Sequence, residues 1–151
     1  MTFDNGVGFS GVCWGCEVMT VRVLNDQGFG YYSWWSAAVI YAVDNGADVI
    51  NMSLAFPPGY IPSLELQQAL HDAADAGVVL IGAAGNDSAD MINWPAASRA
   101  VIAVASARPG SWDADDEETW DGKSAHLADY SNRGLDVESY GCCCFGARWS
   151  R

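Results

Sequence analysis

Basic residues are scarce in this sequence, and the shortage excludes one class of partner. Seven lysines and arginines stand against 19 aspartates and glutamates, which gives a formal net charge of −12 at pH 7. No basic surface is then available to displace counterions from phosphates, so we expect no nucleic-acid partner. Anionic membrane surfaces are disfavoured for the same reason.

Long apolar runs are missing as well. No stretch approaches the ~20 consecutive apolar residues that a membrane-spanning helix needs. The opening segment MTFDNGVGFSGV has neither the basic nor the apolar region of a secretory signal. We therefore expect no membrane partner, and the chain shows no export signal.

The five cysteines lack the arrangement of a structural zinc site. Cys13 and Cys16 form one C-x-x-C pair, which supplies two of the four ligands that zinc needs, and no second pair is placed to help. We expect a local disulfide between them, or two free thiols packed in a turn. The run Cys142 to Cys144 has no partner that the sequence identifies, and the odd count does not settle the redox compartment.

What the sequence does contain is an alternation of two kinds of apolar segment. The 151 residues have the length of one domain and half are hydrophobic, so a packed globule is expected. The predicted strands are 17–24, 47–54, 78–85 and 100–106, and the predicted helices are 33–46 and 63–77. Alternating strands and helices are typical of right-handed crossovers. The predicted fold class is α/β, with a doubly wound parallel sheet.

Local signals place the ends of the two helices. Ser33 and Ser63 are the predicted N-caps, and Gly46 and Gly77 mark the predicted ends. The second helix has one apolar face, formed by Leu66, Ala69, Leu70 and Ala73.

The pattern weakens towards the end of the chain. Residues 1–138 form the predicted domain, interrupted at 108–123 by a segment with six acidic residues that we expect to be a surface loop. The tail 139–151 matches no periodic pattern, and we expect a divergent segment that is disordered or out of frame.

Three strand ends are rich in small residues. They read NDQGFGYYS, NMSLAF and GAAGND, the last of which ends on Asn86 and Asp87. Ligands of open α/β sheets sit outside the carboxyl ends of the strands, and small residues let another backbone come close. Each end alone is typical of an ordinary turn, whereas three together indicate a binding site. A nucleotide site is disfavoured, because NDQGFGYYS lacks the third glycine of a phosphate-binding loop.

In this order the stretches resemble subtilisin-like serine proteases, the subtilases. The resemblance covers roughly residues 2–138. The matching stretches are GVCWGCEVMTVRVLNDQGFGYYS, AVDNGADVINMSL, AGVVLIGAAGND and NWPAASRAVIAVAS, with a weaker match in ADYSNRGLDV. The resemblance implies part of a subtilisin-like fold, hydrolysis of peptide bonds in a peptide or protein substrate, and a secreted or extracellular location.

The resemblance also assigns Asn86 a role. The asparagine that closes the A-A-G-N motif of the family donates its side-chain amide to the oxyanion that forms when a serine attacks a peptide carbonyl. A neutral donor fixed at a strand end suits this chemistry, because it aims at the position where charge develops. The alternative is that Asn86 only caps the turn after the strand.

Further residues carry over by position as substrate contacts. Two strands would hold the substrate backbone between them by β-augmentation, with Gly28, Phe29 and Gly30 on one side and Ser53, Leu54 and Ala55 on the other. The pocket for the residue before the scissile bond would be lined by Ala83, Ala84 and Gly85, with Asp87 at its rim and Asn93 near its base. A second apolar pocket would use Tyr32, Trp35 and Leu54, with Leu24 between the two pockets.

Three details bear on these pockets. Ala55 stands where the family usually has glycine, and Phe56 and the following PPGY stand where the family has more glycine, which would narrow the cleft. Trp35 fits a core position as well as a pocket position. The Trp94–Pro95 peptide bond matches a bond that is cis in the family, and proline is the residue that permits such a bond.

The resemblance leaves the catalytic triad outside the matched stretches. A subtilase uses an Asp, a His and a Ser in that chain order; the Asp and H-G-T-H motifs would lie upstream and the G-T-S-M-A motif downstream. His71 and His126 match no catalytic position, and no serine lies in a G-T-S or G-x-S-x-G context. We therefore expect this chain alone to be inactive, with the flanking protease segments as its partners. The alternative is a short relative that binds peptides without cleaving them.

The segment FDNGVGF resembles a calcium loop of the family. Asn5 would supply its side-chain oxygen, and Phe3, Val7 and Phe9 their carbonyls, which suits a hard cation. Other ligands would come from upstream sequence, so a weak or incomplete calcium site is expected, with no other cofactor.

Overall fold

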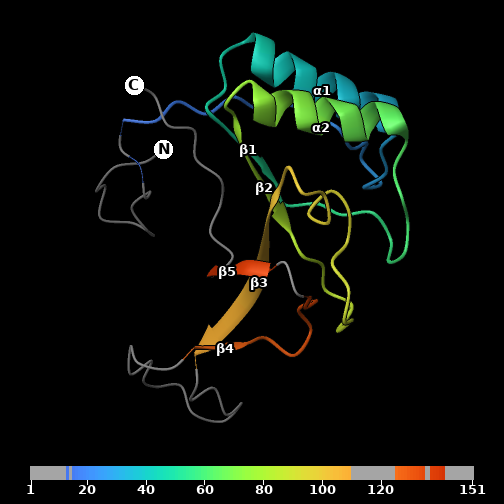
Figure 1. Cartoon of the computed structure of the whole chain (residues 1–151), viewed down its shortest axis with the longest axis vertical. Helices are drawn as coiled ribbons and strands as arrows, with labels where there is room; N and C mark the ends of the chain where they lie inside the picture. The colour runs from blue at the N-terminus through green and yellow to red at the C-terminus, as the bar shows by residue number, and fades with distance from the viewer. Residues whose placement is uncertain (1–12, 14, 110–124, 135–136, 142–151) are drawn as a thin grey trace. The chain divides into compact units, whose positions relative to one another are not determined.

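The computed structural model describes residues 13, 15–109, 125–134 and 137–141, which fall into two compact units (Figure 1). Of these residues, the first unit contains 13, 15–51 and 63–80, and the second contains the rest. Among the described residues, no helix has the length and apolar content needed to cross a bilayer. Each unit is described by itself.

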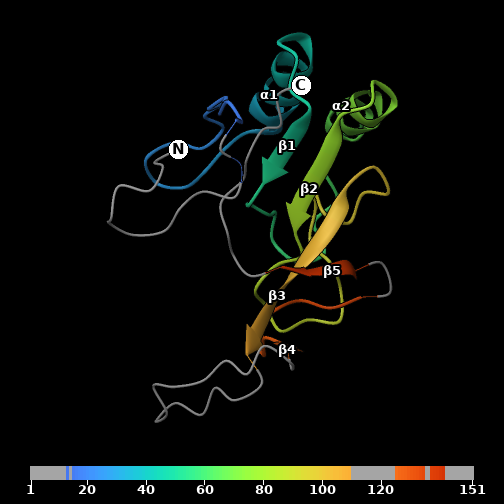
Figure 2. The same cartoon turned by 90° about the vertical axis from the view of Figure 1, so that its left-hand side faces the viewer.

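The first unit contains both helices and the start of the sheet. Helices α1 (Tyr32–Asp44) and α2 (Leu64–Asp75) pack side by side, as both views in Figure 1 and Figure 2 show. Strand β1 (Val49–Met52) is the neighbour of β2 (Val79–Ala83), and the backbone N–H of Val79 donates to the carbonyl of Asp48 at 3.0 Å. The predicted apolar face of α2 is buried, and Leu66 and Leu70 are among the most enclosed side chains.

The helix ends follow the sequence signals at α2 but not at the start of α1. Ser63 is the N-cap of α2, and its hydroxyl accepts from the backbone N–H of Leu66 at 3.4 Å. Gly77 has a φ of 87°, a left-handed conformation that glycine adopts readily after a helix. In α1 the N-cap is Tyr31, which makes no side-chain capping bond. The prediction of Ser33 as N-cap was therefore wrong, because the chain turns into the helix two residues earlier.

Replacing Ser63 with alanine is expected to lower the free energy of unfolding by about 1 kcal/mol, since an orphan N–H of the first turn loses its acceptor. Urea unfolding followed by circular dichroism measures the change. Ser33→Ala is the matched control, because the same hydroxyl is removed from an exposed position inside α1, and its effect should stay within about 0.5 kcal/mol. Equal losses in the two variants would contradict the assignment of the cap.

The predicted strand at 17–24 is not formed. These residues belong to no strand of the described chain, and Val18 is 57% exposed. Arg22 makes local contacts instead, through Nε to the carbonyl of Leu24 at 2.8 Å and through its guanidinium to Asp26 at 2.5 Å. A run of β-branched residues favours a strand only where a neighbouring backbone completes the ladder, and the described chain provides none here.

The second unit holds the rest of the sheet, with β3 (Ile102–Pro109) paired to three strands. The end of β2 pairs with β3 in parallel, with Ile81 opposite Ile102. Strand β5 (Val137–Gly141) also pairs with β3 in parallel, and Figure 2 shows it beside β3. Strand β4 (Ala125–Leu127) pairs with β3 antiparallel. The parallel pairs confirm the α/β class. Strands β4 and β5 were not predicted.

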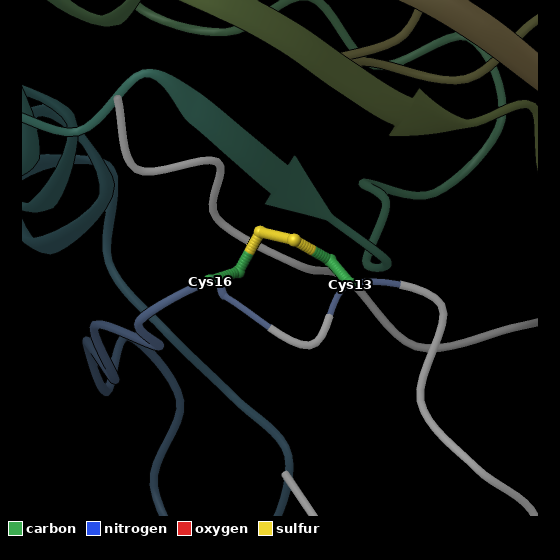
Figure 3. Close-up of a disulfide and its surroundings, with 2 residues drawn as sticks. All are labelled: Cys13 and Cys16. Carbon is green, nitrogen blue, oxygen red and sulfur yellow. A yellow bond between two sulfur atoms is a disulfide. The ribbon is translucent and has the colours of Figure 1, made fainter.

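Cys13 and Cys16 form a disulfide, one of the two alternatives predicted for this pair (Figure 3). Their Cα atoms lie 5.5 Å apart. Most of the acidic segment 108–123 and most of the tail 139–151 lie outside the described residues, so those predictions stay predictions.

Candidate functional site

A cavity of about 340 Å³ lies at the carboxyl end of β2, within the second unit. Two chain segments and one buried side chain form its wall, as is usual for a site at strand ends of an α/β sheet. The lining residues are Ser53, Leu54, Ala55, Phe56, Pro57, Pro58, Ala83, Gly85, Asn86, Asp87 and Asn93.

Most of the residues predicted for the substrate pocket therefore surround one cavity. They are Ser53, Leu54, Ala55, Ala83, Gly85, Asn86, Asp87 and Asn93. Ala84 is an exception, because it is buried behind the lining. Its N–H donates to the carbonyl of Val104 at 2.9 Å, and its own carbonyl accepts from the N–H of Asn93 at 2.9 Å.

Asn86 follows β2 directly and has an exposed side chain at the cavity. Within the described chain this side chain has no hydrogen-bond partner. Its amide is therefore available as a donor to a group inside the cavity. The Asn86 side chain makes no capping hydrogen bond within the described residues, and its role as a donor to a ligand stays a prediction.

Two asparagine amides converge on the carboxylate of Asp87. Its Oδ2 accepts from Nδ2 of Asn93 at 2.7 Å and from Nδ2 of Asn132 at 3.2 Å. Asn93 is 4% exposed, and its Oδ1 is a buried acceptor with no partner in the described part of the chain. One acceptor at the wall of the cavity is thus left for a water or a ligand donor.

Asn132 is the residue of the site that the sequence analysis missed. It is fully buried, and its Oδ1 accepts from the N–H groups of Asp87 at 2.8 Å and Ala89 at 3.1 Å. Its Nδ2 also donates to the carbonyl of Ala84 at 3.2 Å. The signal lay in the stretch ADYSNRGLDV, which matched the family only weakly.

Gly85 occupies a position that has no room for a side chain. Its φ is 113°, and an added Cβ would lie 2.6 Å from Nδ2 of Asn93 and closer still to Nδ2 of Asn132. The glycine therefore allows both amides to approach the backbone next to Asn86.

The Trp94–Pro95 bond is cis, as predicted. The carbonyl of Trp94 accepts from the N–H of Phe56 at 2.8 Å. This hydrogen bond joins the segment that carries Asn93 to the segment that carries Phe56, and both segments line the cavity. Phe56 is 8% exposed and stacks on Tyr60, with ring centroids 5.7 Å apart.

The remaining predicted substrate contacts lie in the first unit, and the cavity is lined only by the second. They are Leu24, Gly28, Phe29, Gly30 and Tyr32. Phe29 is 72% exposed, which suits a contact surface. Leu24 lines a separate groove of about 620 Å³ together with Trp34 and Tyr41, whereas Tyr32 does not.

The other residues singled out from the sequence are Trp35, His71 and Asn5. Trp35 is 6% exposed and packs in the first unit, so the core interpretation holds for it. His71 lies exposed on α2. Asn5 and the rest of the predicted calcium loop lie outside the described residues, and the described residues contain no group of His, Cys, Asp and Glu side chains suited to a metal.

Comparison with known proteins agrees with this geometry. A model described as the Subtilase family matches residues 1–144. Subtilisin DY of Bacillus licheniformis is 41% identical over 105 residues, which cover 67% of this chain and 37% of that protein. Subtilisin E of Bacillus subtilis (strain 168) is 36% identical over 105 residues, which cover 67% of this chain and 27% of that protein.

A solved structure gives the same result for the fold. The psychrophilic subtilisin-like protease Apa1 from the Antarctic psychrotroph Pseudoalteromonas sp. AS-11 matches with a TM-score of 0.60 and 30% identity. The match covers 80% of this chain and 24% of that one. The chain thus spans well under half the length of these relatives.

Proposed function

Because the chain belongs to the subtilase family, with part of its α/β fold, we propose that it supplies the substrate cavity and the oxyanion donor of a serine endopeptidase. The observation that carries the proposal is the position of Asn86. Its amide lines the cavity at the end of β2 and has no other partner in the described chain. A free donor at this point serves a ligand rather than the fold.

The chemistry follows from the position of this donor. A serine oxygen attacks the carbonyl carbon of the scissile peptide bond, and the carbonyl oxygen takes the negative charge. The Nδ2–H of Asn86 donates to that oxygen, and the interaction strengthens as the charge grows, so it lowers the barrier more than it tightens substrate binding. The serine and its histidine base would come from flanking segments of the same protease.

The substrate would lie along the strand ends. Its backbone pairs with Ser53, Leu54 and Ala55, and the side chain before the scissile bond enters the cavity beside Asn93. From the family resemblance alone, Gly28, Phe29 and Gly30 of the first unit are proposed as further contacts of the substrate backbone. An extended peptide is the proposed ligand, and the net charge of −12 argues against nucleic acid and anionic membranes as partners.

Two accompanying proposals rest on the family alone. The protease would act outside the cell, as a secreted enzyme. A weak calcium site would use the Asn5 side chain with the carbonyls of Phe3, Val7 and Phe9, all outside the described residues.

A chimera tests the proposed function. The matched segment, 67% of this chain, replaces its counterpart in Subtilisin DY, which supplies the regions beyond the match. We expect the chimera to cleave a fluorogenic peptide and to react with a serine-directed phosphonate. A chimera that reacts with the phosphonate but cleaves no peptide would contradict the proposal.

The 151-residue chain alone is expected to show no serine protease activity. Its sequence has no serine in the nucleophile context and no histidine in the base context, so the oxyanion donor has no anion to stabilise. Incubation with the phosphonate, followed by mass spectrometry, measures the result. Covalent labelling at any serine would overturn the expectation.

A second candidate function is peptide binding without cleavage, favoured by the same absence of triad motifs. Titration of the ¹⁵N-labelled 151-residue chain with an uncleavable peptide addresses it. Saturable shifts at the cavity residues would show that the cavity binds peptides without the flanking regions, and their absence would leave the endopeptidase proposal alone.

A further inference from the structure

We infer that Asn132 is the positioning residue that holds the backbone on both sides of Asn86, an inference that rests on the proposed function. Four hydrogen bonds from its side chain reach three residues around Asn86. They go to the N–H of Asp87 (2.8 Å), the N–H of Ala89 (3.1 Å), the carbonyl of Ala84 (3.2 Å) and the carboxylate of Asp87 (3.2 Å).

The backbone of Asn132 adds a fifth bond at the remaining neighbour. Its N–H donates to the carbonyl of Gly85 at 2.9 Å. Residues 84, 85, 87 and 89 are therefore all bonded to this one asparagine, and Asn86 between them keeps its side chain free. Asn132 thus supports the loop, and the Asn86 side chain remains available for a ligand.

The orientation of the Asn132 amide is fixed by its neighbours. Its Oδ1 faces two N–H donors, and its Nδ2 faces a carbonyl and a carboxylate. A flipped amide would oppose all four partners, so only one assignment satisfies the network. An aspartate or an alanine cannot reproduce it.

The loop needs this support because its own conformation is unusual. Gly85 has a φ of 113° and Ser88 a φ of 55°, so the chain on either side of Asn86 and Asp87 follows neither helix nor strand geometry. Buried amides in such a loop require partners from elsewhere in the chain. Asn132 supplies them from 43 to 48 residues further along the sequence.

Asn132 itself is anchored to the sheet. The neighbouring Ser131 accepts from the N–H of Ser106 on β3 at 3.0 Å, and its own N–H donates to the carbonyl of Ala128 at 2.9 Å. The Asn86 loop is thus connected through Asn132 and Ser131 to β3, a rigid element. A displacement of about 1 Å at a catalytic donor can lower the rate by about 10²-fold. The connection of Asn132 to β3 therefore matters for the proposed function.

The same network reaches the wall of the cavity. Through Oδ2 of Asp87, Asn132 is joined to Nδ2 of Asn93, which lines the cavity and is almost fully buried. Asn132 therefore fixes the donor and one wall of the substrate cavity at once.

The test uses the 151-residue chain and needs no activity. Asn132→Ala removes all four side-chain bonds, and Asn132→Asp keeps the oxygen that accepts from Asp87 and Ala89. Val101→Ala, a truncation of a buried side chain in the same unit, is the control for loss of stability without loss of loop bonds. Amide hydrogen exchange and ¹⁵N relaxation are the measurements.

In Asn132→Ala we expect exchange at the Asp87 and Ala89 amides to rise at least about tenfold over the control, since two part-buried bonds of about 1.4 kcal/mol or more in total are lost. The backbone order parameter of Asn86 should fall from about 0.85 to below 0.6. Asn132→Asp should give intermediate exchange rates.

Exchange and order at residues 86–89 that match those of Val101→Ala would overturn the inference. If Asn132→Ala fails to fold, Asn132→Asp decides alone: wild-type exchange at Ala84 to Ala89 contradicts the inference, and faster exchange confined to this loop supports it. The proposed function fails separately, through Asn86 in the chimera, and such a failure would leave the exchange result standing.

Discussion

Replacing Asn86 with alanine in the Subtilisin DY chimera should lower kcat by about 10²–10³-fold and leave KM nearly unchanged. The magnitude is the loss known for the corresponding donor of subtilisin, a member of the same family. The direction follows from the proposed role, because the Asn86 amide lines the cavity and has no hydrogen-bond partner in the described chain. A donor used mainly in the transition state affects kcat rather than KM.

Initial rates with a fluorogenic peptide give both constants, and titration with the phosphonate gives the fraction of folded, reactive enzyme. Asn45→Ala is the matched control, since it removes the same side chain from an exposed position at the end of α1. Its kcat should stay within about twofold of the parent. An Asn86→Ala enzyme that keeps more than about a tenth of the parental kcat would refute the donor role.

Replacing Gly85 with alanine should lower the free energy of unfolding by about 3 kcal/mol, through backbone strain and loss of the buried network. The φ of 113° disfavours any side chain, and the new Cβ would meet the amides of both Asn93 and Asn132. The two amides must move, so their bonds to Asp87 are lost as well. Urea unfolding measures the change.

Gly59→Ala separates strain from crowding. Gly59 lies in the same unit and also has a positive φ, of 74°, but an added Cβ would meet nothing within 4 Å. Its cost should be about 1 kcal/mol, the usual penalty for the conformation alone. Equal losses for the two variants would show that the asparagine network is not what makes Gly85 necessary.

Much of the fold could be predicted from local signals. Helix α2 was predicted within two residues at either end, because Ser63, the apolar face and Gly77 all act within a few turns of chain. Strand β3 was predicted at 100–106 rather than Ile102–Pro109, so the prediction began two residues and ended three residues too early. Its far end was missed because it is held by β4, whose three residues carry no pattern of their own. The strand predicted at 17–24 failed for the related reason that composition does not say whether a partner strand is present.

The candidate site also has a part that the sequence predicted and a part that it did not. Asn86 and its small neighbours were predicted because their motif is contiguous, and the cavity residues on 53–55 followed from a second contiguous motif. The sequence by itself thus determined the family and the parallel α/β class, and it placed Asn86 at the end of β2 as the proposed donor. Only the tertiary structure decided what holds the donor in place, because Asn132 is separated from Asp87 by 45 residues and from Ala84 by 48, and its hydrogen bonds exist only once β3 brings the two segments together.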